Sequence, residues 1–152
     1  MDKKFWKHKK VLVTGHTGFK GSWLSLWLLN LGANVFGYSL KPNEDQKLFN
    51  DLFVKNNKIN KSFSNLNHFI GDINDSIKLS SYIQQIKPDI VFHLAAQPLV
   101  RKSYENPIQT WQTNVIGTLN LLEALKSLNN FCAAILITTD KVYENKEWIY
   151  GY

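Results

Sequence analysis

The sequence predicts an α/β protein in which helices cover both faces of a doubly wound parallel sheet. Three observations support this prediction. Short apolar runs rich in β-branched residues alternate with amphipathic segments of helical length along the whole chain. Three glycines stand where the first of these runs passes into a helix. The 152 residues, of which 44% are hydrophobic, suffice for one domain with a sizeable core.

The first half of the chain is expected to form three strands and two helices. Each strand is apolar and is bounded by Gly, Asn or Pro. The first helix is apolar nearly all round and is closed by Gly32. A polar segment rich in Lys and Asn favours a long loop with one short helix. In order, these elements are a strand at 10–15, a helix at 19–31, a strand at 34–40, a loop at 41–65 with a helix near 48–54, and a strand in "NHFIGDI" that starts at Asn67 and ends near Gly71.

The second half repeats the alternation of helix and strand. A helix from Asp75 has apolar residues at helical spacing and is stopped by Pro88. A β-branched strand, a long amphipathic helix and a last apolar strand follow. Five strands joined by right-handed crossovers predict the strand order 3-2-1-4-5 of a Rossmann fold. In order, these elements are a helix at 75–87, a strand at 88–96, a helix at 107–128 and a strand at 132–139.

Composition argues against several classes of partner. The formal net charge is +6, but "MDKKFWKHKK" alone carries +4, which is typical of a solvated end. No basic stripe is interleaved with aromatic residues, so a nucleic-acid partner is not expected. The single cysteine, Cys132, fits a reducing cytoplasm. The most apolar helix has about ten residues where roughly twenty are needed to cross a bilayer, so no membrane partner is expected. No His or Cys spacing is typical of a metal site.

The motif "GHTGFKG" has its glycines at positions 15, 18 and 21. The first is expected to allow a tight turn, and the second to let the backbone approach a pyrophosphate. The third lets the helix pack close to the sheet. A helix N-terminus at this point offers unpaired N–H groups to phosphate. The motif therefore predicts a dinucleotide site, with a purely structural turn as the alternative.

Taken together, the motifs "VTGHTGFKGSWL", "GDI", "VFHLAAQ", "TNVIGTLNLLEA" and "ITTDKVYEN" resemble those of the extended short-chain dehydrogenase/reductase family that acts on nucleotide sugars. Within this family the similarity is greatest to the branch that dehydrates CDP-glucose. The resemblance covers residues 11 to about 150. It implies bound NAD, with NADP as the weaker alternative, a CDP-glucose substrate and a homodimer or higher homo-oligomer, with the helix at 107–128 in the dimer interface.

The resemblance also assigns roles to individual residues. Gln97, Arg101 and Thr139 are expected at the substrate, and Thr139, Asp140 and Lys141 in catalysis. Asn114 is expected to position a catalytic lysine through water. The residues expected to bind the cofactor are Gly15, Thr17, Gly18, Phe19, Lys20, Gly21, Ser39, Asp72, Ile73, Leu94, Ala95, Ala96, Gln97 and Asn114.

Several of these residues have a second interpretation. Asp72 could hydrogen-bond an adenine amino group or simply form a turn. Ser39 together with Lys41 could accept the 2′-phosphate of NADP, although the resemblance implies NAD. Arg101, the only arginine, suits bidentate contact with a diphosphate or an ordinary surface ion pair. His93 is expected to be a core histidine with its hydrogen bonds satisfied, and His16 could face solvent.

The resemblance implies a 4,6-dehydration. NAD takes hydride from C4 of the sugar, water leaves across C5 and C6, and hydride returns to C6. Asp140 would protonate the leaving hydroxyl and Lys141 would assist at C5. Related enzymes that use dTDP-glucose have Glu where this chain has Lys141. A strand-end turn is the plain alternative for this segment.

The Tyr-x-x-x-Lys pair of the family is absent from the 152 residues, because no Tyr is followed by Lys at that spacing. We expect this pair, the last strands and a substrate lobe beyond Tyr152, so that residues 1–152 are a dinucleotide-binding domain that binds weakly and does not turn over alone. The alternatives are a non-catalytic nucleotide-binding remnant or subunit, and a related nucleotide-sugar epimerase.

Overall fold

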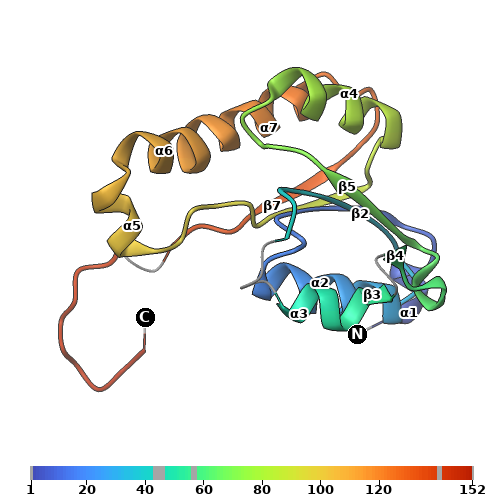
Figure 1. Cartoon of the computed structure of the whole chain (residues 1–152), viewed down its shortest axis with the longest axis horizontal. Helices are drawn as coiled ribbons and strands as arrows, with labels where there is room; N and C mark the ends of the chain where they lie inside the picture. Colours follow the sequence, from blue (N-terminus) through green and yellow to red (C-terminus); the bar gives the residue numbers. More distant parts are fainter. Residues whose placement is uncertain (1, 43–46, 56–57, 140–141, 152) are drawn as a thin grey trace.

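A computed structural model describes residues 2–42, 47–55, 58–139 and 142–151. Its centre is a parallel sheet with helices on both faces (Figure 1). The strands lie in the order β5-β2-β1-β6-β7, which confirms the predicted order 3-2-1-4-5. Their bounds are β1 (Lys10–Thr14), β2 (Asn34–Ser39), β5 (Leu66–Ile70), β6 (Ile90–His93) and β7 (Ala133–Leu136).

Two layers of helices enclose the sheet. In Figure 1 one layer lies below the sheet and holds α2 (Phe19–Asn30) and α3 (Lys47–Phe53). The other lies above it and holds α4 (Ser76–Ile86) and α7 (Gly117–Lys126). Each layer buries its own apolar cluster against the sheet. Val13 and Phe49 belong to the α2–α3 side, and Leu12 and Leu79 to the α4–α7 side. This alternation along β1 is what a strand buried on both faces requires.

Both ends of α4 lie where the sequence predicts them, and each has a local cause. Asp75 caps the helix by accepting a hydrogen bond from the Lys78 amide at 3.0 Å. Lys87 ends it in a left-handed conformation with φ +49°, and Pro88 follows. The predicted helix at 75–87 is therefore confirmed to within one residue at each end.

The predicted long helix at 107–128 is interrupted by a wider turn. It consists of α6 (Pro107–Trp111), a π-helical segment η2 (Gln112–Ile116) and α7. Single π-turns inside an α-helix occur often at functional sites. An additional helix, α5 (Val100–Glu105), occupies the loop that follows β6.

The sequence suggested that the basic N-terminal segment is a solvated end, but the structure shows that part of it packs on the protein. It forms a short helix, α1 (Lys3–Trp6), and Trp6 is half-buried. The Trp6 ring stacks on Phe92 of β6, with ring centroids 6.4 Å apart. A parallel sheet needs apolar cover on both faces, and Trp6 supplies part of it beside α2.

The polar loop at 41–65 contains more structure than expected. Besides α3, which matches the predicted short helix, it forms a two-stranded antiparallel pair and a 3₁₀ turn. These are β3 (Val54–Lys55), β4 (Lys58–Ile59) and η1 (Lys61–Phe63).

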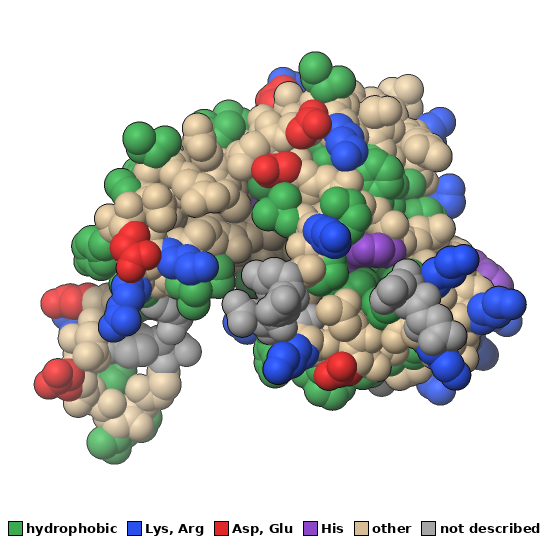
Figure 2. Space-filling view, in the orientation of Figure 1, with side chains coloured by type: hydrophobic (Ala, Val, Ile, Leu, Met, Phe, Trp, Pro, Cys, Tyr) green, Lys and Arg blue, Asp and Glu red, His purple; other side chains and the backbone are tan. Residues whose placement is uncertain are grey.

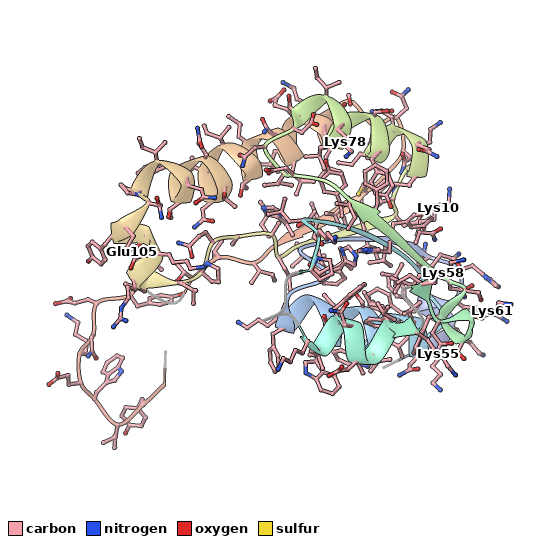
Figure 3. The ribbon with its side chains drawn as sticks, viewed as in Figure 1. Lys10, Lys55, Lys58, Lys61, Lys78 and Glu105 are labelled. Atoms are coloured by element: carbon pink, nitrogen blue, oxygen red, sulfur yellow. The ribbon has the colours of Figure 1, made fainter. Side chains whose placement is uncertain are left out.

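Basic side chains gather at one end of the sheet. Lys10, Lys55, Lys58 and Lys61 lie close to the amino ends of the strands (Figure 3). This is the end opposite to the carboxyl ends, where parallel sheets bind ligands. Within the described ranges, no helix has the length and apolar character needed to cross a bilayer.

Candidate functional site

A cleft of about 680 Å³ lies at the carboxyl ends of the strands. Figure 2 shows the molecule hollowed between the α5–α6 part and the α2–α3 layer. The cleft is formed by the turn after β1, the end of β2, the segment after β5 and the loop after β6. Of the residues expected to bind a cofactor, those that line it are Gly15, Thr17, Gly18, Phe19, Lys20, Gly21, Ser39, Asp72, Ile73, Leu94, Ala95 and Ala96.

The glycine turn brings backbone within contact distance of backbone. Gly15 has φ +71°, a conformation that L side chains rarely adopt, and a Cβ on it would lie 2.8 Å from the Ala95 nitrogen. A Cβ on Gly21 would lie 2.2 Å from the Gly15 carbonyl oxygen. At Gly18 the nearest atom would be 3.3 Å away, so this position is open on the cleft side. At Gly15, Gly18 and Gly21 the turn therefore faces the cleft with bare backbone.

Two buried hydroxyls join this turn to the end of β2. The Thr17 and Ser39 hydroxyl oxygens are 2.9 Å apart, and the Ser39 hydroxyl donates to the Leu40 carbonyl at 3.1 Å. Both side chains are buried. Either hydroxyl can be the donor between them, and the Thr17 hydroxyl also lies 3.4 Å from the Leu40 carbonyl.

Asp72 forms a turn, as its plainer interpretation predicted. Its Oδ1 accepts a hydrogen bond from the Asn74 amide at 2.9 Å, and its carbonyl accepts one from the Tyr38 hydroxyl at 3.1 Å. The Asp72 side chain is exposed at the cleft. Ile73 is only 5% exposed and packs on Gly117 of α7, where a Cβ would meet it at 2.5 Å.

The loop after β6 is tied to β1 through Thr14. The Thr14 hydroxyl oxygen accepts from the Leu94 and Ala95 amides, each at 3.2 Å. It lies 2.7 Å from His93 Nδ1, so the hydroxyl proton is directed to that nitrogen. His93 Nε2 then carries the ring proton and donates to Thr118 at 3.0 Å.

His93 is therefore a core histidine with both nitrogens used, as expected from the sequence. Its side chain is 3% exposed, and burial lowers its pKa. A neutral ring fits these two contacts.

Asn114 clamps the same loop from the π-helical segment. Its Oδ1 accepts from the Gln97 amide at 2.7 Å, and its Nδ2 donates to the Gln97 carbonyl at 3.1 Å. The Gln97 side chain in turn donates to Thr110 at 3.1 Å and accepts from the Leu99 amide at 2.8 Å. The extra residue of the π-turn and this two-bond clamp hold the loop against the helix.

We expect the Asn114→Asp variant to lose about 2 kcal/mol of unfolding free energy, because a carboxylate oxygen would then face the Gln97 carbonyl. Urea unfolding at pH 7 measures this difference. Asn120, which is half-buried like Asn114, donates to backbone carbonyls at the longer distances of 3.2 and 3.4 Å, and Asn120→Asp is the matched control, with an expected loss of under about 1 kcal/mol. Equal losses in the two variants would contradict the clamp.

The residues expected at the substrate are less closely gathered. Thr138 lines the cleft, and Thr139 follows it with an exposed side chain. Arg101 lies on α5 with its side chain exposed. Asp140 and Lys141 lie outside the described residues. In the described part of the chain no three His, Cys, Asp or Glu side chains gather as metal ligands do.

His16 does not face solvent, which corrects the sequence expectation. Its side chain is fully buried behind the glycine turn, and its Nε2 lies 2.6 Å from Nδ1 of His68 on β5. Burial, with a smaller contribution from His68, lowers the pKa of His16 to about 3. No local pattern in the sequence indicates that His16 pairs with His68, because the two residues are 52 positions apart.

Comparison with known proteins identifies the family to which the chain is similar. A family model described as GDP-mannose 4,6 dehydratase matches residues 12–147. The chain is 53% identical over all 152 residues to the CDP-glucose 4,6-dehydratase of Salmonella typhimurium, of which it covers 40%. It is 34% identical over 142 residues to the CDP-paratose 2-epimerase of Salmonella typhi, covering 91% of this chain and 39% of that protein. It is 38% identical over 122 residues to GDP-mannose 4,6 dehydratase 1 of Arabidopsis thaliana, covering 80% of this chain and 33% of that protein.

Solved structures share the fold. The chain superimposes on Pal from Bacillus thuringiensis with a TM-score of 0.76 at 28% identity, covering 89% of this chain and 40% of that one. The UDP-glucose 4-epimerase of Thermus thermophilus, solved in complex with NAD, gives a TM-score of 0.60 at 30% identity, covering 76% and 33%. The chain thus spans about 40% or less of the length of these relatives.

Proposed function

The chain belongs to the GDP-mannose 4,6 dehydratase family of short-chain dehydrogenases/reductases, and from that membership we propose that it forms the NAD-binding domain of a CDP-glucose 4,6-dehydratase. The observation that carries the proposal is the 53% identity over the whole chain to a protein of that name. The GDP-mannose and CDP-paratose relatives reach 38% and 34% over shorter alignments.

The cleft fits a dinucleotide on its own geometry. Its volume lies in the range typical of small-molecule sites, about 300–1,000 Å³. A side chain at Gly15 or Gly21 would strike backbone, and the start of α2 turns its free N–H groups toward the same space. Gly15, Gly18 and the α2 N-terminus would hold the pyrophosphate.

The other residues that line the cleft suggest the remaining contacts with the cofactor. Asp72 and Ile73 would receive the adenine, and Ala95 and Ala96 leave room for a ribose against the loop after β6. When bound, NAD supplies a hydride acceptor. The Ser39 hydroxyl already has partners inside the protein, the Thr17 hydroxyl at 2.9 Å and the Leu40 carbonyl at 3.1 Å, which favours NAD over NADP.

In this proposal the substrate chemistry needs more than residues 1–152. Thr139 follows β7 at the carboxyl end of the sheet, and Gln97 and Arg101 follow β6. Asp140 and Lys141 come next after Thr139 in the sequence. We assign Asp140 the role of acid for the departing hydroxyl and Lys141 the assisting role at C5. The Tyr-x-x-x-Lys pair and the substrate lobe are assigned to chain outside these residues.

The long helical face supports an oligomer. Trp111, Leu119 and Leu122 on α6 and α7 are 66%, 51% and 42% exposed, which is an unfavourable arrangement for a monomer in water. We propose that this face pairs with its equivalent in a homodimer. The single free cysteine, Cys132, agrees with a cytoplasmic location.

Calorimetric titration tests the cofactor assignment. NAD is expected to bind the chain at one site, with NADP at least fivefold weaker. The protein as its source makes it, incubated with CDP-glucose, is expected to form a 4-keto-6-deoxy sugar. GDP-mannose, tested in parallel, is expected to give no product. Turnover of GDP-mannose in preference to CDP-glucose would contradict the substrate assignment.

A further inference from the structure

The ring of His16 packs against the sheet at Gly37, in the space that a side chain at this position would occupy. Gly37 lies between Val13 of β1 and His68 of β5 in the register of the sheet. A Cβ on Gly37 would lie 2.3 Å from the His16 ring, so the ring rests directly on the strand. Because Gly37 has no side chain, His16 can reach across β2 to His68.

Two residues, His68 and Phe49, hold this ring in place. His16 Nε2 and His68 Nδ1 are 2.6 Å apart, so one nitrogen donates a proton and the other accepts it. Phe49 of α3 meets both histidines, with ring centroids 5.3 Å from His16 and 5.0 Å from His68. The ring is therefore fixed from β5 and from α3 together.

The backbone of His16 is also the backbone of the glycine turn. Its Cα lies where a Cβ on Gly21 would approach to 2.7 Å. The Ser22 hydroxyl lies 2.8 Å from the Gly18 carbonyl and 3.3 Å from the His16 carbonyl, so it bridges the two ends of the turn. His16 does not line the cleft, whereas its neighbours Gly15 and Thr17 do. Any movement of the ring would thus move the surface that faces the ligand.

We propose that His16 and His68 act as a positioning pair, which holds the turn at residues 15–18 from behind in the shape that binds the diphosphate of the dinucleotide. The inference rests on the proposed function, since it names what fixes that site. Neither histidine touches the ligand. The edge strand β5 thereby contributes to a site formed by β1 and β2.

Two substitutions at His68 separate the hydrogen bond from the packing. His68→Phe keeps a ring against Phe49 but has no nitrogen for His16. His68→Asn, the conservative variant, places an amide near the position of Nδ1. Dissociation constants for NAD are measured by calorimetry at pH 7.5, and circular dichroism establishes that each variant is folded. If His68→Phe does not fold, His68→Leu replaces it.

We expect NAD to bind His68→Phe roughly tenfold more weakly than the wild type, and His68→Asn within about threefold of it. Equal affinities for the wild type and His68→Phe would overturn the inference while leaving the proposed function intact. Equal weakening in both variants would also overturn it, because the hydrogen bond would then be irrelevant. A wild-type chain that binds no NAD would overturn the proposed function and this inference with it.

Discussion

Replacement of Gly21 by alanine is expected to abolish NAD binding and to lower the unfolding free energy by about 3 kcal/mol. The added Cβ would lie 2.2 Å from the Gly15 carbonyl oxygen and 2.7 Å from the His16 Cα. Both are backbone atoms, so no side chain can rotate away. Either α2 or the turn must move, and each shift breaks the close approach that shapes the cleft.

Gly18→Ala is the matched control in the same turn. Its Cβ would meet only the Gly15 oxygen, at 3.3 Å, and its backbone has an ordinary φ of −72°. We expect a stability change of under about 1 kcal/mol and a clear loss of NAD affinity, since the new methyl lies on the cleft side. Urea unfolding and NAD titration of the two variants measure both quantities. A Gly21→Ala variant as stable as Gly18→Ala would contradict the close packing of helix on turn.

The chain is expected to lose stability steeply as the pH falls below neutral, and His16 is a main cause. Its pKa is about 3 in the folded chain and about 6.5 when unfolded. Below pH 6.5 the unfolded chain therefore binds a proton that the folded chain does not bind. The resulting loss grows as the pH falls and stops near the folded pKa. Between pH 7 and pH 4.5 this single group accounts for about 2.5 kcal/mol.

The His16→Phe variant isolates this effect. It lacks the titrating ring but keeps an aromatic group beside Phe49. Its unfolding free energy should therefore fall less steeply as the pH is lowered, with a slope that corresponds to about one fewer proton taken up on unfolding. Burial also lowers the pKa values of His68 and His93, and these groups continue to act in the same direction in the variant. Urea unfolding at several pH values between 4.5 and 7 gives the two slopes. Parallel profiles would show that His16 is not the group responsible.

Local patterns predicted the fold well because they depend on neighbours in the chain. The spacing of Gly15, Gly18 and Gly21 placed the turn, and Asp75 with Pro88 marked the ends of a helix. The strand order followed from right-handed crossovers between parallel strands. None of these predictions needed to know which distant residues meet.

The direction of His16 could not be predicted, because it depends on two distant facts. The ring turns inward because Gly37 leaves a gap, and because His68 stands opposite Gly37 on the edge strand. Trp6 is a similar case, since its ring stacks on Phe92, a residue far away in the sequence. The π-turn at Asn114 likewise reflects its hydrogen bonds to Gln97, which lies 17 residues earlier.

The position of the dinucleotide site is tested most directly by mapping where NAD contacts the chain by NMR. In a ¹⁵N-labelled sample, we expect NAD to shift the amide signals of Gly15, Gly18 and Ala95, which line the cleft. The signals of Lys58 and Lys61, at the opposite end of the sheet, should stay unchanged. Shifts confined to the lysine end, or no shifts at all, would contradict a dinucleotide site at the carboxyl ends of the strands.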